Sequence, residues 1–264
     1  MASEAIARNP PVAAPSVATP AAEVVPEAVA AYRRKYRDEQ IGPRYSGVAH
    51  LLTTSIAALG GVLACALAVR SARPVEWLTV PLAFLFANLV EYGAHRGPMH
   101  HRLPIDLFIT SLLYQRHALA HHRYYTDESM AAESHRDYKM VLFPPQVVFF
   151  FIGLVALPTF FVLRAAVTPN VGYLFSATAL GYFVSYEWLH LAYHLPRGSR
   201  IGRLAVIAAL RRHHAAHHDP RKMQRWNFNI TFPIADALFG TTFRPASGGT
   251  SDPDRSADLA APRV

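Results

Sequence analysis

Long apolar runs constrain this chain more strongly than any other feature of its sequence. Residues 50–69 contain no acidic residue, lysine or arginine, and the run is just long enough to cross the roughly 30 Å hydrocarbon core of a bilayer. A second run covers residues 75–90, after a short turn that contains Pro74. A similar pair follows at residues 141–167 and 171–191. The pattern predicts four transmembrane helices in two hairpins.

The distribution of basic residues predicts which side of the membrane is cytoplasmic. Cytoplasmic segments close to a span collect Lys and Arg. The segment before the first run contains Arg33, Arg34, Lys35, Arg37 and Arg44, and further groups follow the second and fourth runs. The opposite side has only Arg70, Arg73 and Arg164. We therefore expect an all-α, multi-pass membrane protein with both termini and a helical cap in the cytoplasm.

Amino-acid composition predicts where the membrane domain begins and ends. Residues 1–30 are rich in Ala and Pro without a regular period, which predicts a disordered tail. Residues 31–245 form the predicted membrane domain, and residues 246–264 a second disordered tail. No basic start or unbroken apolar stretch indicates a secretory signal, so the first span is expected to insert as an uncleaved anchor. Residues 105–115 are apolar but too short to span, and predict an interfacial helix.

Cysteine content and charge exclude several classes of site and partner. The single cysteine, Cys65, cannot form a disulfide within the chain or supply a CxxC zinc site. The formal net charge of +8 is not accompanied by basic segments interleaved with aromatic residues, so no nucleic-acid partner is expected. In a membrane protein, an excess of Lys and Arg is explained by topology and by contact with anionic lipids.

Histidines are the strongest functional signal. Ten of the 14 histidines fall into four short clusters, at the ends of predicted spans or between them. The clusters are His95 and His100; His117, His121 and His122; His190 and His194; and His214, His217 and His218. One histidine pair on a helix is commonly surface decoration, but ten imidazoles in a small cap are costly to bury without a metal or hydrogen-bond partner. We therefore interpret the clusters as metal ligands.

The spacing within the clusters indicates how the imidazoles are presented. His117 and His121 are four residues apart and share one helical face, whereas His122 is offset by about a hundred degrees. Such a helix could offer ligands to two adjacent metal ions. His95 and His100 are five residues apart, but a glycine and a proline interrupt the helix between them, so both imidazoles could turn toward one centre.

Ligand type and number narrow the choice of metal. Neutral imidazole suits iron, copper, nickel and zinc, whereas calcium and magnesium prefer oxygen ligands. Ten nitrogen ligands exceed the needs of one ion, but they suit two ions with about five nitrogens each and an open position on each ion. The residues themselves are compatible with iron and with zinc.

The order of the clusters resembles a known family. The patterns HxxxxH, HxxxHH, HxxxH and HxxHH are interleaved with two membrane hairpins, as in the integral membrane fatty acid hydroxylase and sterol desaturase superfamily. The segment after the last cluster, with Asn227, Asp236 and a Phe-Gly-Thr sequence ending at Thr241, is similar to the closing stretch of that family. The resemblance covers roughly residues 47–244. The second cluster has three residues before its His-His pair, where many relatives have two.

The resemblance implies a di-iron centre that activates dioxygen to hydroxylate a lipid. Its ligands would be His95, His100, His117, His121, His122, His190, His194, His214, His217 and His218. Zinc could replace iron in purified material. Electrons would come from an external donor, a ferredoxin or cytochrome with its reductase. The substrate could be an acyl chain, a sterol-like ring, a carotenoid or a lipid head group, in a bacterial inner membrane.

Residues outside the clusters have two interpretations each. The remaining histidines are expected at the surface or as supports of the ligands: His50, His101, His135 and His213. Asp236, Asn227 and Glu91 could orient imidazoles, because a metal-bound histidine usually donates its second nitrogen to a carboxylate or carbonyl. A cap or turn, and for Glu91 a membrane boundary, is the alternative. Four aromatic residues are expected in packing or an interfacial belt, with substrate contact as the alternative: Tyr182, Phe183, Tyr186 and Trp188.

Two other functions could use the same residues. A desaturase would use the same di-iron centre but remove a second hydrogen atom instead of adding oxygen. A metal transporter would place polar ligands within its spans, near the middle of the bilayer. The clusters lie at span ends and in the predicted cap, a position that favours an enzyme.

Overall fold

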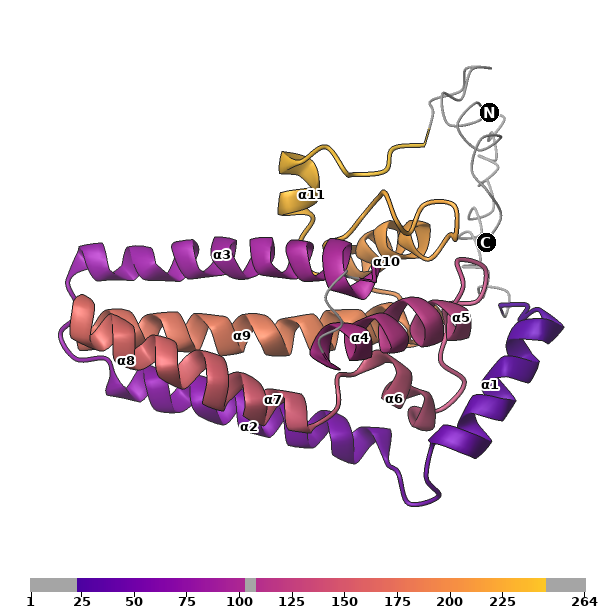
Figure 1. Ribbon diagram of the computed structural model, residues 1–264, viewed down its shortest axis with the longest axis horizontal. Helices are drawn as coiled ribbons and strands as arrows, with labels where there is room; N and C mark the ends of the chain where they lie inside the picture. Colours follow the sequence, from indigo (N-terminus) through magenta and orange to yellow (C-terminus); the bar gives the residue numbers. More distant parts are fainter. Residues whose placement is uncertain (1–22, 103–107, 246–264) are drawn as a thin grey trace, which may run out of the picture.

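All regular elements are helical in the part of the chain that the structure describes, residues 23–102 and 108–245. The structure is a computed structural model. Long helices run side by side along most of the molecule, and several short helices gather at one end of this bundle (Figure 1). The predicted all-α fold is therefore confirmed, and the short helices form the cap.

The first hairpin contains α2 (Gly47–Ala68) and α3 (Thr79–Ala94), joined through the 3₁₀ turn η1 (Pro74–Leu78). α2 begins after Ser46, whose hydroxyl accepts a hydrogen bond from the amide of Ala49. One face of α2 carries large apolar side chains that are each more than half exposed: Leu52, Ile56, Leu63 and Leu67. A continuous apolar surface of this kind is suited to lipid rather than water.

The second hairpin consists of a composite helix and one long helix. α7 (Gln146–Phe151), the π-helical η5 (Ile152–Ala156) and α8 (Leu157–Ala166) follow one another without a break. α9 (Pro169–Tyr193) then returns toward the cap and packs against α2, α3 and α8. In Figure 1, α9 lies between α3 and the other long helices, so it is the central helix of the bundle.

Only part of the predicted four-span pattern is apolar throughout. In the described chain, three segments are long and apolar enough to cross a membrane: Gly47–Ala68, Pro74–Met99 and His135–Ala166. They contain most of the first three predicted spans. The predicted fourth span, residues 171–191, lies in α9, whose sequence is more polar, so the number of long helices agrees roughly with the prediction. α9 can carry polar residues because of its central position: Ser176, Tyr182 and Glu187 are buried against neighbouring helices.

Polar side chains connect the two hairpins at the end opposite the cap. The Glu76 carboxylate accepts hydrogen bonds from the Thr168 hydroxyl (2.5 Å) and from the Asn170 side-chain amide (3.3 Å). Asn170 also exchanges two hydrogen bonds with the backbone of Arg70. These contacts join the two hairpins where their connecting turns meet.

The cap begins with the π-helical turn η2 (His95–Met99), which continues α3. Its other elements, in chain order, are α4 (Phe108–Tyr114), the π-helical η3 (Gln115–His121), α5 (His122–Tyr124), η4 (His135–Asp137), α6 (Tyr138–Val141), α10 (Ala205–His217) and α11 (Ile234–Leu238). The predicted interfacial helix at 105–115 corresponds to α4 from Phe108 onward. Residues 105–107 lie outside the described residues.

The helix α1 (Glu27–Gln40) packs against α5 beside the cap. It begins at Glu27, four residues before the predicted start of the membrane domain at residue 31. Pro26 immediately precedes the helix, where a proline does not interrupt it, and the negative charge of Glu27 suits the first turn. The predicted tails at residues 1–22 and 246–264 lie outside the described residues.

Candidate metal centre

All ten predicted ligands are buried in the cap and converge on two adjacent groups. Group A consists of His95, His100, His117, His122 and His217. Group B consists of His121, His194, His214 and His218. Within each group, one ring nitrogen of every histidine lies within 4.8 Å of those of the others. The tenth histidine, His190, adjoins group B, with its Nε2 atom 3.3 Å from the Nε2 atom of His121.

A π-helical turn brings the first two histidines together. His95 and His100 are five residues apart, and their ring centroids lie 4.9 Å apart in group A. In a π-helix the backbone bonds from residue i to residue i+5, so residues at this spacing align on one side. η2 therefore explains a separation that does not fit an α-helix.

A second π-helical turn corrects the predicted presentation of His117, His121 and His122. Their spacing suggests that His117 and His121 share a face, as they would in an α-helix. In η3, however, the amide of His122 donates to the carbonyl of His117. His117 and His122 consequently face group A with their Nε2 atoms 3.1 Å apart, whereas His121 faces group B. One helix serves both groups as predicted, but with a different pairing.

α10 also contributes to both groups. His214 and His218 are four residues apart, and their Nε2 atoms lie 3.1 Å apart in group B. His217, on the other side of the helix, places its Nε2 atom 2.9 Å from that of His100 in group A. His194, at the end of α9, completes group B, with its Nε2 atom 3.3 Å from that of His214.

Backbone carbonyls orient half of these imidazoles. Five Nδ1 atoms hydrogen-bond carbonyl oxygens: His95 to Phe228, His121 to Met140, His194 to Met130, His217 to Trp226 and His218 to Tyr125. A carbonyl only accepts, so each of these Nδ1 atoms carries the proton and each Nε2 atom presents a lone pair. The Nε2 atoms of His121 and His218 lie 3.2 Å apart, and two such lone pairs repel unless a cation lies beside them. The donor set therefore fits metal ions, which bind histidines held in this way.

Burial keeps the imidazoles of the cap neutral. Loss of hydration lowers the pKa of His121 to about 4, and it holds the pKa of His117, His214 and His218 well below the usual 6.5. Neighbouring imidazoles lower these pKa values further, because two adjacent positive charges repel. Neutral imidazole is the form that binds metals, so the histidines are in the right protonation state at physiological pH.

Asp236 and Asn227 act on the backbone of the closing segment, residues 226–231. Asp236 is completely buried and accepts hydrogen bonds from the amides of Phe228 (2.9 Å) and Asn229 (2.7 Å). Asn227 has a φ of 59°, and its side-chain amide donates to a carbonyl of α10. Both residues therefore shape a turn, which was the alternative interpretation. The turn presents the carbonyls that accept from two imidazoles of group A.

Glu91 connects the same closing segment to α3 through hydrogen bonds. Its buried carboxylate accepts hydrogen bonds from the amides of Ile230 and Thr231, the latter at 3.0 Å. It also accepts a hydrogen bond from the hydroxyl of Tyr182, which joins α9 to this network. Glu91 thus supports group A through the backbone of the closing segment.

The four histidines outside the clusters have three different environments. His101 and His135 are exposed, in agreement with the surface interpretation. His50 is buried, and its two ring nitrogens hydrogen-bond a tyrosine hydroxyl (2.7 Å) and a backbone carbonyl (2.8 Å). His213 lies with its Nε2 atom 3.3 Å from a carboxylate oxygen of Asp236, so it supports the closing segment.

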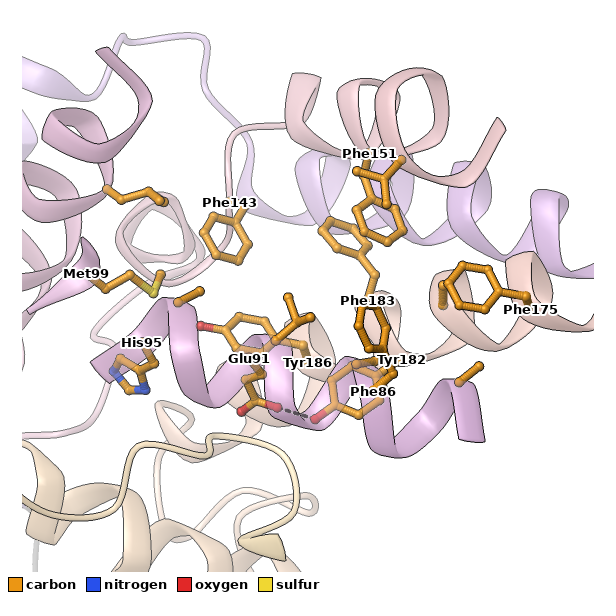
Figure 2. Close-up of a pocket in the computed structure, with 17 residues that line it drawn as sticks. Phe86, Glu91, His95, Met99, Phe143, Phe151, Phe175, Tyr182, Phe183 and Tyr186 are labelled. Carbon is orange, nitrogen blue, oxygen red and sulfur yellow. Dashed lines mark hydrogen bonds between the residues drawn. The ribbon is translucent and has the colours of Figure 1, made fainter. Parts of the chain in front are cut away.

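An apolar cavity of about 470 Å³ extends from the bundle to group A, where His95 forms part of its wall (Figure 2). Three of the predicted aromatic residues line it: Tyr182, Phe183 and Tyr186. Their position corresponds to the substrate-wall alternative. Trp188 is absent from the lining; it is 45% exposed, and its indole N–H donates to the hydroxyl of Ser55 at 2.8 Å.

Sequence reasoning missed the rest of this wall. The additional aromatic and sulfur-containing lining residues are Phe86, Met99, Phe143, Phe151 and Phe175. In an apolar span, such residues look the same whether they face lipid, a neighbouring helix or a cavity. A usable signal was the row of small residues Ala83, Ala87 and Ala94, whose helical spacing leaves one side of α3 uncovered.

A smaller cavity of about 110 Å³ reaches both histidine groups. Its wall includes His117 of group A together with His121 and His190 beside group B. It shares three lining residues with the apolar cavity: Met99, Leu113 and Phe143. The two cavities therefore meet next to the histidines, where a bound molecule could approach both groups.

Comparison with known proteins agrees with this geometry. The family model described as fatty acid hydroxylase matches residues 80–241, which is more than half of the 264-residue chain. A solved structure of full-length Scs7p, in which only the hydroxylase domain is visible, is similar in fold with a TM-score of 0.53. The two chains are 21% identical, and the match covers 74% of this chain and 67% of the other. Among curated proteins, none matches this chain.

Proposed function

The chain belongs to the fatty acid hydroxylase family, and from this premise we propose that it is a dioxygen-dependent lipid hydroxylase with two iron ions held by groups A and B. One observation carries the proposal: the nine buried histidines of groups A and B, with His190 beside them, adjoin an apolar cavity that extends into the helical bundle. A protein that only stored metal would not need such a cavity.

The donor set favours two transition-metal ions. Group A offers five imidazoles, and group B offers four with His190 adjoining as a fifth. All are neutral nitrogen ligands, which suit iron better than they suit calcium or magnesium. Bound iron would supply the redox chemistry that activates dioxygen, because amino-acid side chains cannot do so by themselves.

The apolar cavity is the proposed binding site for an alkyl chain. It follows α3 and η2 from Ala83 to Met99, and a helix of this length rises about 24 Å. Such a length suits an extended acyl chain that enters from the bilayer. The carbon to be oxidised would lie where the two cavities meet, beside Met99, Leu113 and Phe143. Their apolar side chains exclude water from the reacting carbon.

The reaction requires a second protein. Hydroxylation inserts one oxygen atom of dioxygen into a C–H bond, and the other oxygen atom leaves as water. Two protons and two electrons balance this reaction. We propose that a ferredoxin or cytochrome, reduced by its reductase, donates the electrons at the cytoplasmic face. The basic residues near the cap, among them Arg34 and Lys35, support this orientation because cytoplasmic segments collect positive charge.

Lipid analysis of cells that express the chain tests the proposal. Total lipids would be compared by mass spectrometry between cells that express wild type, His217→Ala or His101→Ala in air. We expect a lipid with one extra oxygen atom in cells with wild type and with the control His101→Ala, whose side chain is exposed outside both groups. His217→Ala should abolish it. A product that lacks two hydrogen atoms would instead establish desaturation, and identical lipids in all three strains would contradict an oxidative function.

A further inference from the structure

A fully buried arginine on α1 raises the question of its role. Arg33 has an exposed fraction of 0% and donates hydrogen bonds to the carbonyl oxygens of Tyr124 (2.8 Å), Ser129 (2.6 Å) and Ala131 (3.2 Å). Among the described residues, its one ion-pair partner is Glu133, which lies 3.0 Å away and is about half exposed. Burying a charge away from water costs free energy unless the charge is hydrogen-bonded. For Arg33, three carbonyl groups of one loop supply these hydrogen bonds. We call residues 124–133 the arginine loop.

The arginine loop supports two ligands of group B. The carbonyl of Tyr125 accepts from Nδ1 of His218 at 2.7 Å, and the carbonyl of Met130 accepts from Nδ1 of His194 at 2.8 Å. The amide of Ala132 also donates to the carbonyl of His194 at 2.7 Å. The carbonyls bound by Arg33 belong to the residues next to Tyr125 and Met130 in the loop, so the guanidinium holds the backbone on which both carbonyl contacts to the histidines depend.

Group A has a different support. The imidazoles of His95 and His217 donate to the carbonyls of Phe228 and Trp226, in the closing segment. That segment is held by Asp236 and Glu91 from elements that do not include α1. Each group therefore has its own supporting backbone: α1 holds the arginine loop beside group B, and α3 and α11 hold the closing segment beside group A.

We infer that Arg33 is a positioning residue for group B. Through the arginine loop it holds His194 and His218 in the orientation that a metal ion needs, whereas none of its hydrogen bonds within the described residues reaches the closing segment beside group A. This inference rests on the proposed function, because it assumes that both groups bind metal. Arginine is required at this position because its planar guanidinium group donates hydrogen bonds to several carbonyls at once, whereas lysine presents a single ammonium group.

The remaining contacts of α1 allow the inference to be tested without losing the fold. Arg37 forms a bidentate ion pair with the buried Asp137, with distances of 2.7 and 2.9 Å. It forms a second ion pair with Glu133 at 2.8 Å. Asp137 in turn accepts a hydrogen bond from the hydroxyl of Tyr124 at 2.6 Å. We therefore expect α1 to stay docked when Arg33 alone is changed.

The experiment measures how many iron ions each full-length variant retains. Wild type, Arg33→Lys, Arg33→Met and the control Arg34→Lys would be purified in lipid nanodiscs, loaded with iron(II) without oxygen, and titrated with a chelator. Arg34 is exposed and pairs only with Glu27 on its own helix among the interactions seen here, so its variant should match wild type. We expect the Arg33 variants to bind one ion normally and the other about 10- to 100-fold more weakly.

A second pair of variants separates positioning from general stability. In a His218→Ala background group B is already disrupted, so adding Arg33→Lys should leave the remaining ion unchanged. In a His217→Ala background, adding Arg33→Lys should weaken the remaining ion. Equal weakening of both ions, or no change in either, would overturn the inference. A wild-type chain that never binds two ions would instead refute the proposed function, and the inference with it.

Discussion

Asp236→Asn tests whether the closing segment controls the metal affinity of group A. One carboxylate oxygen of Asp236 accepts from the amide of Phe228 (2.9 Å) and the hydroxyl of Thr241 (2.7 Å). The other oxygen accepts from the amide of Asn229 at 2.7 Å. An asparagine can keep the first set of contacts, but its NH₂ group would then face the amide of Asn229, and two donors cannot form a hydrogen bond.

The expected magnitude follows from that lost contact. A hydrogen bond to a charged group contributes about 1.5–3 kcal/mol, and the stranded amide is buried. The strain falls on the segment whose carbonyls orient His95 and His217. We expect about 2 kcal/mol of this loss to weaken metal binding at group A. Because each 1.4 kcal/mol corresponds to a factor of about ten, the affinity of group A for its ion should fall by about 30-fold.

Chelator titration of the iron-loaded protein measures this effect. Asp236→Asn should release one ion at a chelator concentration about 30-fold lower than wild type, while the other ion is retained. Asp38→Asn, an exposed change on α1 that also removes one negative charge, serves as the control and should behave as wild type. Unchanged affinities of both ions in Asp236→Asn would refute the argument that backbone carbonyls hold the ligands.

Two further predictions concern pH and the cavity. Because the pKa of His121 is about 4 in the folded state and about 6.5 when unfolded, the unfolded chain binds more protons between these values. The metal-free protein should therefore lose about 1.4 kcal/mol of stability per pH unit for each such histidine as the pH falls below 6.5, and a melting temperature that does not fall between pH 7 and pH 5 would contradict this. Ala179→Phe should fill the cavity and reduce product formation at least about tenfold without loss of metal, whereas the exposed Ala66→Phe should not. Full activity of Ala179→Phe would exclude the cavity as the substrate site.

The sequence predicts the ligand set but not its division between the groups. Cluster spacing and the costs of burial are sufficient to identify all ten histidines that the structure brings together. The pairing of His117 with His122 depends on a π-helical turn, and the sequence of that segment contains nothing that predicts one. An α-helix, which is far more common, would instead place His121 on the same face as His117.

Long-range contacts explain the other differences between prediction and structure. The first three predicted spans are strongly apolar, and many of their large apolar side chains are exposed in the structure. α9 is more polar, and its polar side chains are buried because other helices surround it. This central position depends on how the helices pack and cannot be read from the sequence of α9. The importance of Arg33 is likewise invisible in the sequence, where it is one of several basic residues before the first span. Its role depends on carbonyls about a hundred residues away, which the fold brings to it.

Labelling with isotopic dioxygen tests the hydroxylase function most directly. Purified wild-type protein in nanodiscs of host lipid, loaded with iron and supplied with a reduced ferredoxin and its reductase, would be exposed to heavy dioxygen. We predict a hydroxylated lipid that carries one heavy oxygen atom and is not formed by His217→Ala. A product whose oxygen comes from water, or an equal yield from His217→Ala, would contradict oxygen insertion at the histidine groups.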